Sequence, residues 1–220
     1  ILSQIFAFTA APVTVFLSGI IGSQFSPVKS LATLPMALSI VGIAIFAIFA
    51  AKVMSIIGRR AGFMLASVAS SLSSVLAAYS IITESFILFN FSCFLLGAGV
   101  AFSHQYRFAA VETVKKDMAP KAISIILLAG IGSAFIGPNV ANITKGLVAE
   151  HLYAGSYIAL AALTLTSTIF LLFYEDGHKP NHVNKKIKRS YLELISQPRF
   201  LQALVASAFA YAVMSFLMTA

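Results

Sequence analysis

Seven long stretches without a charged residue dominate this sequence and leave few folds open to it. They are Ile1–Val28, Ser30–Ala51, Ala61–Thr83, Ser85–Tyr106, Ala122–Thr144, His151–Tyr174 and Phe200–Ala220. Each is long enough for a helix across a hydrocarbon core about 30 Å thick, which takes about 20 residues. Lipid offers no partner to a free backbone N–H or C=O, so each stretch is expected to be helical. The stretches therefore predict an all-α membrane protein with seven transmembrane helices.

The composition favours a membrane protein over other classes. Charged residues make up 10% of the chain and its mean hydropathy is +0.93, whereas soluble domains carry about 25% charged residues. The net charge of +8 does not indicate a nucleic-acid partner, because the basic residues flank the apolar stretches. We find no Gly-x-x-x-x-Gly-Lys phosphate loop, no metal-ligand spacing among the four His and one Cys, and no pair of acids within a span. We therefore expect no enzyme, no bound metal and no cofactor.

The positions of Lys and Arg predict the orientation of the chain in the membrane. The gaps after the second, fourth and sixth stretches hold 13 of the 15 basic residues, and the other gaps hold only Lys29 and Lys145. Loops rich in Lys and Arg face the cytoplasm. The N-terminus is therefore expected in the cytoplasm, and the first span runs outward.

The spacing of the stretches predicts three parts of the chain. We expect a six-helix bundle over 1–174, a polar cytoplasmic linker over 175–198, and the first helix of a second half over 199–220. Six spans divide into three plus three, and an odd number of spans inverts the second triplet, a recurrent plan in transporters. A seven-helix receptor fits less well, because such receptors start outside and this chain starts inside. The chain begins with Ile and ends in an apolar stretch, so we expect the natural protein to extend beyond both ends.

The gap between the second and third stretches contains Gly58-Arg59-Arg60. The segment from Ala51 to Phe63 resembles the loop motif of the major facilitator superfamily, which ends in Gly-Arg-Arg or Gly-Arg-Lys. Ser55 stands where that motif has an Asp. The resemblance implies that Gly58, Arg59 and Arg60 take part in conformational gating on the cytoplasmic side. Glu112 follows the fourth span on the same side, so we expect it to pair with these arginines and to tie the two triplets together.

The fifth stretch contains Gly130-Ile131-Gly132-Ser133 followed by Phe135-Ile136-Gly137-Pro138. This segment resembles in part the Gly-Pro motif of antiporters in the same superfamily. Pro138 is expected to bend its helix, because proline removes a backbone hydrogen bond to the residue four positions earlier. We expect Gly137 and Pro138 to contribute to gating, or else to close packing of helices.

The fourth stretch carries a polar cluster that is a candidate substrate-binding site. It consists of His104, Gln105, Tyr106 and Arg107, to which we add Gln4 of the first stretch. An ionisable residue within a span is costly and usually faces a cavity. Arg107 could bind an anionic or carbonyl-bearing solute with its planar donors, and His104 could couple transport to protons. The alternative is that Arg107 extends to the headgroups at the end of its span.

The resemblance implies a secondary active transporter of a small organic solute in a bacterial inner membrane, working by alternating access between two six-helix halves. The stretch from Gln105 to Ala110 and the turn from Ala119 to Ser124 look like a proteobacterial branch that includes riboflavin and siderophore carriers. The expected partners are the solute, the lipid bilayer and, if transport is coupled to them, protons. Two alternatives stay open at this point: a drug or metabolite exporter on the same fold, and a membrane interaction protein that transports nothing.

Overall fold

The computed structural model describes residues 1–174 and 196–219, without the side chains of Lys116 and of 214–219. Most of the linker expected over 175–198 lies outside the described residues. Contacts divide the chain into two units, Ile1–Gly177 and His178–Ala220. The second unit contributes one described helix, α10 (Pro198–Thr219), in the range of the seventh predicted span.

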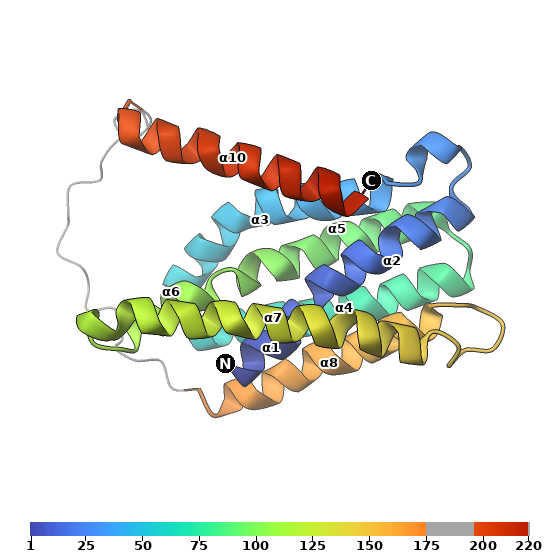
Figure 1. Cartoon of the computed structure of the whole chain (residues 1–220). Helices are drawn as coiled ribbons and strands as arrows, with labels where there is room; N and C mark the ends of the chain where they lie inside the picture. The colour runs from blue at the N-terminus through green and yellow to red at the C-terminus, as the bar shows by residue number, and fades with distance from the viewer. Residues whose placement is uncertain (175–195, 220) are drawn as a thin grey trace. The chain divides into compact units, whose positions relative to one another are not determined.

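The first unit is built of helices, as predicted. They are α1 (Leu2–Phe8), α2 (Ala10–Phe25), α3 (Leu34–Ile57), α4 (Arg59–Ile82), α5 (Phe86–Ser103), α6 (Tyr106–Glu112), α7 (Ala119–Thr144) and α8 (Ala154–Leu172), with short 3₁₀ turns η1 (Lys29–Leu31) and η2 (Lys116–Met118) (Figure 1). Among the described residues, six helical segments are long and apolar enough to cross a membrane, because α1 continues into α2 and α5 into α6. The described residues contain no strand. The prediction of an all-α membrane protein is confirmed.

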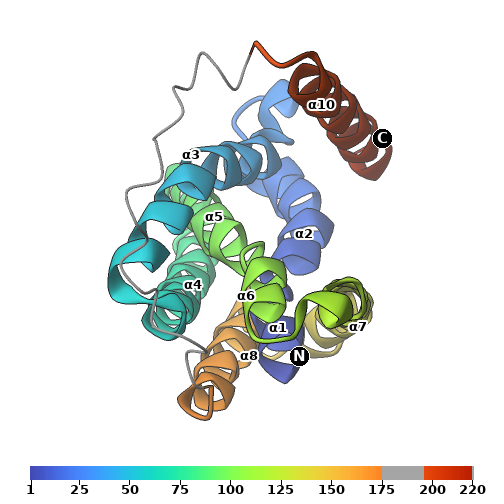
Figure 2. The same cartoon turned by 90° about the vertical axis from the view of Figure 1, so that its left-hand side faces the viewer.

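The packing relates the first three spans to the next three. The second span (α3) packs most extensively on the fourth (α5), and the first span (α1 and α2) packs on the fifth (α7). The third span (α4) packs on the fourth (α5), and the sixth (α8) packs on the first (α1). The third and sixth spans also pack on each other. If the first, second and third spans are matched with the fourth, fifth and sixth, each of these pairs has its counterpart, which is the pattern expected of inverted repeats. In the view along the helices, α1 and α6 lie between α4, α7 and α8 (Figure 2).

Gly58 alone separates α3 from α4. Its backbone has φ 90° and ψ 163°, a conformation that residues with a Cβ rarely adopt. The chain can therefore reverse between two 24-residue helices at a single residue, which places Arg59 and Arg60 in the first turn of α4.

Two spans are interrupted near the same end of the unit. The first breaks at Thr9, between α1 and α2. Pro12 accounts for this break, because its ring clashes with the carbonyl group of Phe8 and its nitrogen has no hydrogen to donate to that carbonyl oxygen. The fourth span breaks at His104 and Gln105, between α5 and α6, and no proline lies within four residues of that break.

Glycines at the α3–α5 crossing let the two backbones touch. A Cβ on Gly97 would overlap the carbonyl oxygen of Ser39, and a Cβ on Gly42 would overlap that of Phe94. These are backbone atoms that cannot rotate away. Close approach through small residues is a main source of helix association in membranes, where burial of apolar surface contributes little.

We predict that Gly97→Ala destabilises the protein by about 1–3 kcal/mol, the usual cost of overpacking. Gly130→Ala is the matched control, because a Cβ on that helical glycine meets no atom within 4 Å. The control should leave stability unchanged or raise it by up to about 1 kcal/mol through helix propensity. Thermal aggregation of the full-length protein in detergent, followed by size-exclusion chromatography, measures both. Equal melting temperatures for the two variants would contradict the packing argument.

Candidate functional site

Most charged side chains of the described residues gather at one end of the first unit, which we call the basic end. It is formed by the start of α1, the α3–α4 turn, α6, the start of α7 and the end of α8. Its charged residues are Lys52, Arg59, Arg60, Arg107, Glu112, Lys115, Asp117 and Lys121. Both helix interruptions lie toward this end. All the residues expected in substrate binding and gating, apart from Gly137 and Pro138, lie at or near it.

Arg59 and Arg60 tie the two helix triplets together at the basic end. The Nε and Nη2 atoms of Arg59 donate to the two carboxylate oxygens of Glu112, at 3.1 and 2.6 Å. Arg60 Nη2 donates to the carbonyl oxygen of Leu172 at 2.6 Å, at the end of α8. The first two residues of α4 thus contact both α6 and α8. The side chains of Arg59 and Glu112 are 23% and 53% exposed, so solvent screening limits the pair to about 0–1 kcal/mol.

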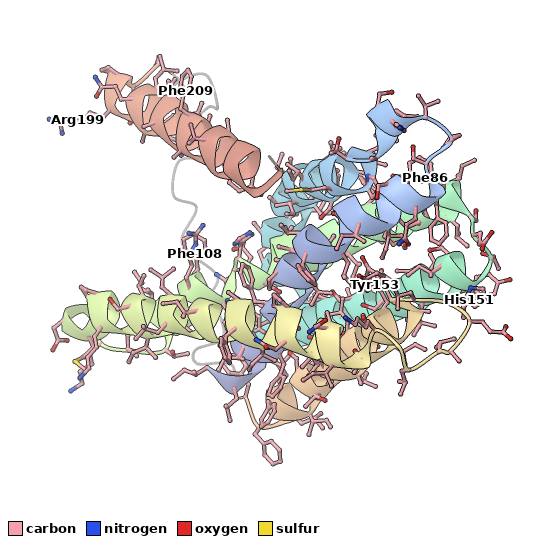
Figure 3. The ribbon with its side chains drawn as sticks, turned by 45° about the vertical axis from the view of Figure 1, so that its right-hand side comes forward. Phe86, Phe108, His151, Tyr153, Arg199 and Phe209 are labelled. Carbon is pink, nitrogen blue, oxygen red and sulfur yellow. The ribbon has the colours of Figure 1, made fainter. Side chains whose placement is uncertain are left out.

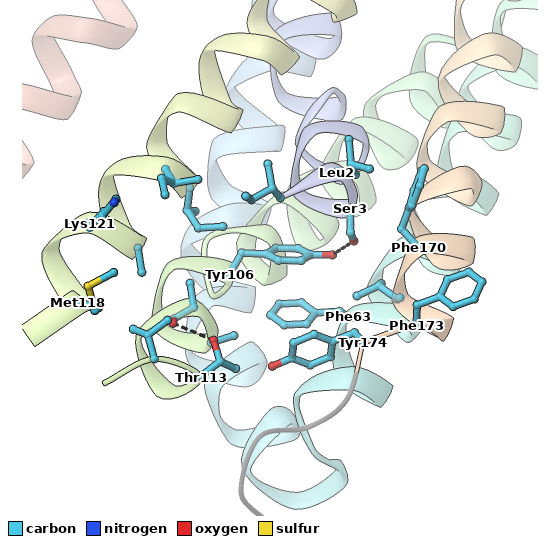
Figure 4. Close-up of a pocket in the computed structure, with 18 residues that line it drawn as sticks. Leu2, Ser3, Phe63, Tyr106, Thr113, Met118, Lys121, Phe170, Phe173 and Tyr174 are labelled. Atoms are coloured by element: carbon cyan, nitrogen blue, oxygen red, sulfur yellow. Dashed lines mark hydrogen bonds between the residues drawn. The ribbon is translucent and has the colours of Figure 1, made fainter. Parts of the chain in front are cut away.

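A chain of buried hydroxyl groups joins four spans beside this ion pair. Ser3 Oγ lies 2.7 Å from Tyr106 Oη and 3.0 Å from Ser167 Oγ, which in turn lies 3.1 Å from Ser67 Oγ. Tyr106 also stacks on Phe63, with ring centroids 3.9 Å apart (Figure 4). The chain links α1, α4, α6 and α8, and it holds Tyr106 in the protein interior.

The predicted polar cluster of the fourth span is divided by the break in that span. Tyr106 is buried, whereas Arg107 is exposed on α6, with its guanidinium carbon 5.1 Å from the centre of the Phe108 ring. Figure 3 shows Phe108 on the outside of α6. His104 and Gln105 form the interruption itself and are half-buried. Arg107 and Tyr106 are therefore neighbours in sequence that meet different surroundings.

The two interruptions meet across the unit. The ring of Phe8, at the end of α1, packs edge-on against His104 with centroids 5.4 Å apart. Gln4 lies one turn earlier on α1 and is 6% exposed, and its amide Oε1 has no hydrogen-bond partner among the described residues. A buried amide oxygen without a partner is costly, which makes Gln4 a polar group available to a solute or to water.

Gly137 brings the fifth span against the first interruption. A Cβ on Gly137 would lie 3.1 Å from Pro12 Cγ and 3.2 Å from Val13 Cγ2. Pro138 lies inside α7, which continues through it to Thr144. The absence of a side chain at residue 137 thus lets the fifth span approach the first span closely next to its break.

Sequence reasoning did not single out Ser3, Phe63, Ser67 or Ser167. Serines are common in membrane helices as ordinary packing residues, and nothing in their spacing distinguishes these three. Ser3 and Ser167 are 164 positions apart, so only the tertiary fold brings them together.

Comparison with known proteins identifies the family. The family model described as Major Facilitator Superfamily matches residues 1–220. The chain belongs to the major facilitator superfamily. The resemblance seen at Gly58-Arg59-Arg60 is confirmed by this match, and the six membrane-length helices agree with a multi-pass membrane protein of this superfamily.

Three relatives support the assignment. The riboflavin transporter RfnT of Brucella anthropi is 30% identical over 221 residues, which cover 100% of this chain and 56% of the relative. Two uncharacterized MFS-type transporters of Bacillus subtilis, YddS and YdeG, are 26% and 25% identical and cover 79% and 77% of this chain. The chain spans about half the length of these relatives. No solved structure matches it.

We predict that Ser3→Ala destabilises the protein by about 1 kcal/mol, because it leaves Tyr106 and Ser167 without the hydroxyl that bridges them. Ser23→Ala is the control, because Ser23 is exposed and bonds only the carbonyl of Ile20 in its own helix. Melting temperatures of the full-length variants in detergent provide the measurement. If the Ser3→Ala and Ser23→Ala variants have the same melting temperature, the hydroxyl chain does not contribute to stability.

Proposed function

We propose that this chain forms the N-terminal half, and the first helix of the second half, of a secondary active transporter in a bacterial inner membrane. It moves a small organic solute by alternating access of the two halves. Riboflavin, or a planar solute of similar chemistry, is the first candidate substrate. Support comes from the family match over the full chain and from the riboflavin transporter that is 30% identical along all of it.

The observation that carries the proposal is the meeting of the two interrupted spans at Phe8 and His104. Transporters typically bind substrate where membrane helices are discontinuous, because the backbone and side chains at the break are free to face a solute. Aromatic and polar groups gather there. Phe8 offers a ring face or edge, Gln4 an unpartnered amide oxygen, and Arg107 an exposed guanidinium on the next turn.

These groups take different roles in the proposed mechanism. Arg107 donates hydrogen bonds to the carbonyl oxygens of a planar ring system, for which its planar fork of donors is suited. Gln4, Gln105 and Tyr106 contribute further polar contacts. His104 is the candidate for proton coupling, since histidine is the side chain whose charge changes most readily near neutral pH.

The basic end is proposed to face the cytoplasm, and its ion pair to act in gating. Thirteen of the 15 basic residues fall in the gaps after the second, fourth and sixth apolar stretches of the sequence, as expected for cytoplasmic loops. Arg59 and Glu112 connect the two triplets there, and Gly58 provides the tight turn that positions Arg59 and Arg60. Gly137 contacts the first span at its break, and Pro138 follows it in α7; both are proposed to contribute to gating. An exporter on the same fold is the second candidate, favoured only by the antiporter-like Gly137-Pro138.

The proposal predicts that the full-length protein carries labelled riboflavin into a riboflavin-auxotrophic bacterial strain that lacks its own importer. Arg107→Ala should raise the KM for uptake about tenfold or more, because a charge-assisted hydrogen bond contributes about 1.5–3 kcal/mol. Lys145→Ala, at the opposite end, is the control and should leave uptake unchanged. In vesicles, an imposed pH gradient should drive uptake, and His104→Gln should remove that dependence.

Three outcomes would count against parts of this proposal. If expression of the protein lowers the accumulation of riboflavin in the cells, the protein is an exporter. Unchanged uptake and affinity in Arg107→Ala excludes its role in binding. Absence of transport of riboflavin and of related planar solutes, in a protein that is folded in the membrane, favours a membrane protein without transport activity.

The ion pair gives a separate prediction. Glu112→Gln should lower the transport rate by up to about fivefold, because about 1 kcal/mol of coupling between the triplets is lost. The double variant Arg59→Glu, Glu112→Arg should recover part of the loss by restoring the pair in reverse. Glu150→Gln, an exposed acid at the opposite end, is the matched control. A double variant no better than its single parents would exclude a role for the pair itself.

A further inference from the structure

A cavity of about 610 Å³ lies at the basic end, apart from the break at His104. Its walls come from the start of α1, Phe63 of α4, one face of α6, the first two turns of α7 and the end of α8. Tyr106 is the one member of the predicted substrate cluster that lines it. His104, Gln105, Arg107 and Gln4 do not, so the cavity adjoins the proposed substrate site and shares only Tyr106 with it.

The cavity is apolar inside and carries one charge at its rim. Of the 18 described residues that line it, Lys121 alone is charged, and none is acidic. Lys121 is exposed and makes no ion pair with a described residue. Figure 4 shows Lys121 and Met118 on one side of the cavity and Phe170 and Phe173 on the other, with Tyr106 and Phe63 between them. The arrangement suits a ligand with an apolar body and an anionic end.

The rim of the cavity is also apolar and exposed. Leu2 is 54% exposed, Met118 44% and Phe173 83%. Contact of this apolar rim with water is unfavourable, whereas contact with the acyl chains of lipids is compatible with it. The lining residues lie at the ends of membrane spans or in the segments next to them, which is the depth at which lipid chains meet their headgroups. Tyrosines such as Tyr174 are typical of that depth.

We propose that this cavity binds an anionic phospholipid of the surrounding leaflet, with one acyl chain between α7 and α8 and the phosphate at Lys121. The charge of Lys121 selects an anionic headgroup over a zwitterionic one, since a basic residue near the membrane surface attracts anionic lipid. The apolar walls select a lipid over a free phosphate, which would gain contact with Lys121 alone. The bound lipid would contact α1, α6 and α8, the helices that the Ser3 hydroxyl chain joins.

The test uses the full-length protein in phosphatidylcholine vesicles that contain phosphatidylglycerol with a photoactivatable group on one acyl chain. After illumination, cross-linked peptides are identified by mass spectrometry. We expect cross-links in the segments around Ile125 and Ile126 and around Phe170, and a weaker signal there from photoactivatable phosphatidylcholine. Lys121→Gln should lower the phosphatidylglycerol signal by about fivefold, the effect of one basic residue near an anionic surface. Soluble glycerol phosphate should not compete.

Two variants of α7 distinguish binding in the cavity from general contact with lipid. Ala122→Trp fills the cavity, because Ala122 lines it, and should abolish the cross-links near Phe170. Ile123→Trp is the matched control, because Ile123 is on the same helix but does not line the cavity, and it should leave them intact. Equal labelling by the two lipids, or labelling unaffected by both Lys121→Gln and Ala122→Trp, would overturn the proposal. So would a protein segment cross-linked into the cavity in place of lipid.

Discussion

The constraint on which the rest of this structure depends is that lipid provides no hydrogen-bond partner to the backbone. It makes every span a helix, and it limits where a span can break. At the first break the hydroxyl and the backbone N–H of Thr9 both donate to the carbonyl oxygen of Phe6, at 2.6 and 3.4 Å. At the second break, the N–H of Gln105 donates to the carbonyl oxygen of Phe102, three residues earlier, whereas the acceptor in an α-helix lies four residues earlier. Both breaks lie where neighbouring spans cover them.

The same constraint governs the hydroxyl side chains of the spans. Most of them donate to a carbonyl three or four residues earlier in their own helix, as Ser74 does to Ser70 and Thr164 to Leu160. The hydroxyl chain through Ser3 differs, because it runs between helices and places polar contacts where the two triplets meet. Together with the Arg59–Glu112 pair, it concentrates the specific contacts at the basic end. Toward the opposite end, an apolar core with Leu17, Ile81, Phe89 and Tyr157 dominates the packing.

This division relates structure to the proposed mechanism. Alternating access is largely movement of one half as a body against the other, combined with gating. The apolar core and the glycine crossing of α3 and α5 provide the rigid part. The short helices α1 and α6, each of seven residues and joined by Ser3 and Tyr106, lie beyond the two breaks. The proposed substrate site lies at the breaks, and the proposed lipid site lies beside the short helices.

The sequence by itself determined the number, range and class of the first six spans, since length and apolarity are all that a membrane helix requires. It also led to the family through Gly58-Arg59-Arg60, and it singled out Gly137 as a candidate for close packing of helices. The tertiary structure alone decided the partners of those residues. The break at His104 has no local cause, and Tyr106 is buried while Arg107 is exposed because Ser3 and Phe63 hold the tyrosine. The contacts of the hydroxyl chain join residues that lie 100 or more positions apart in the sequence. Such contacts leave no periodic pattern, because the helices are apolar nearly all round. Only the packed bundle could therefore define the site.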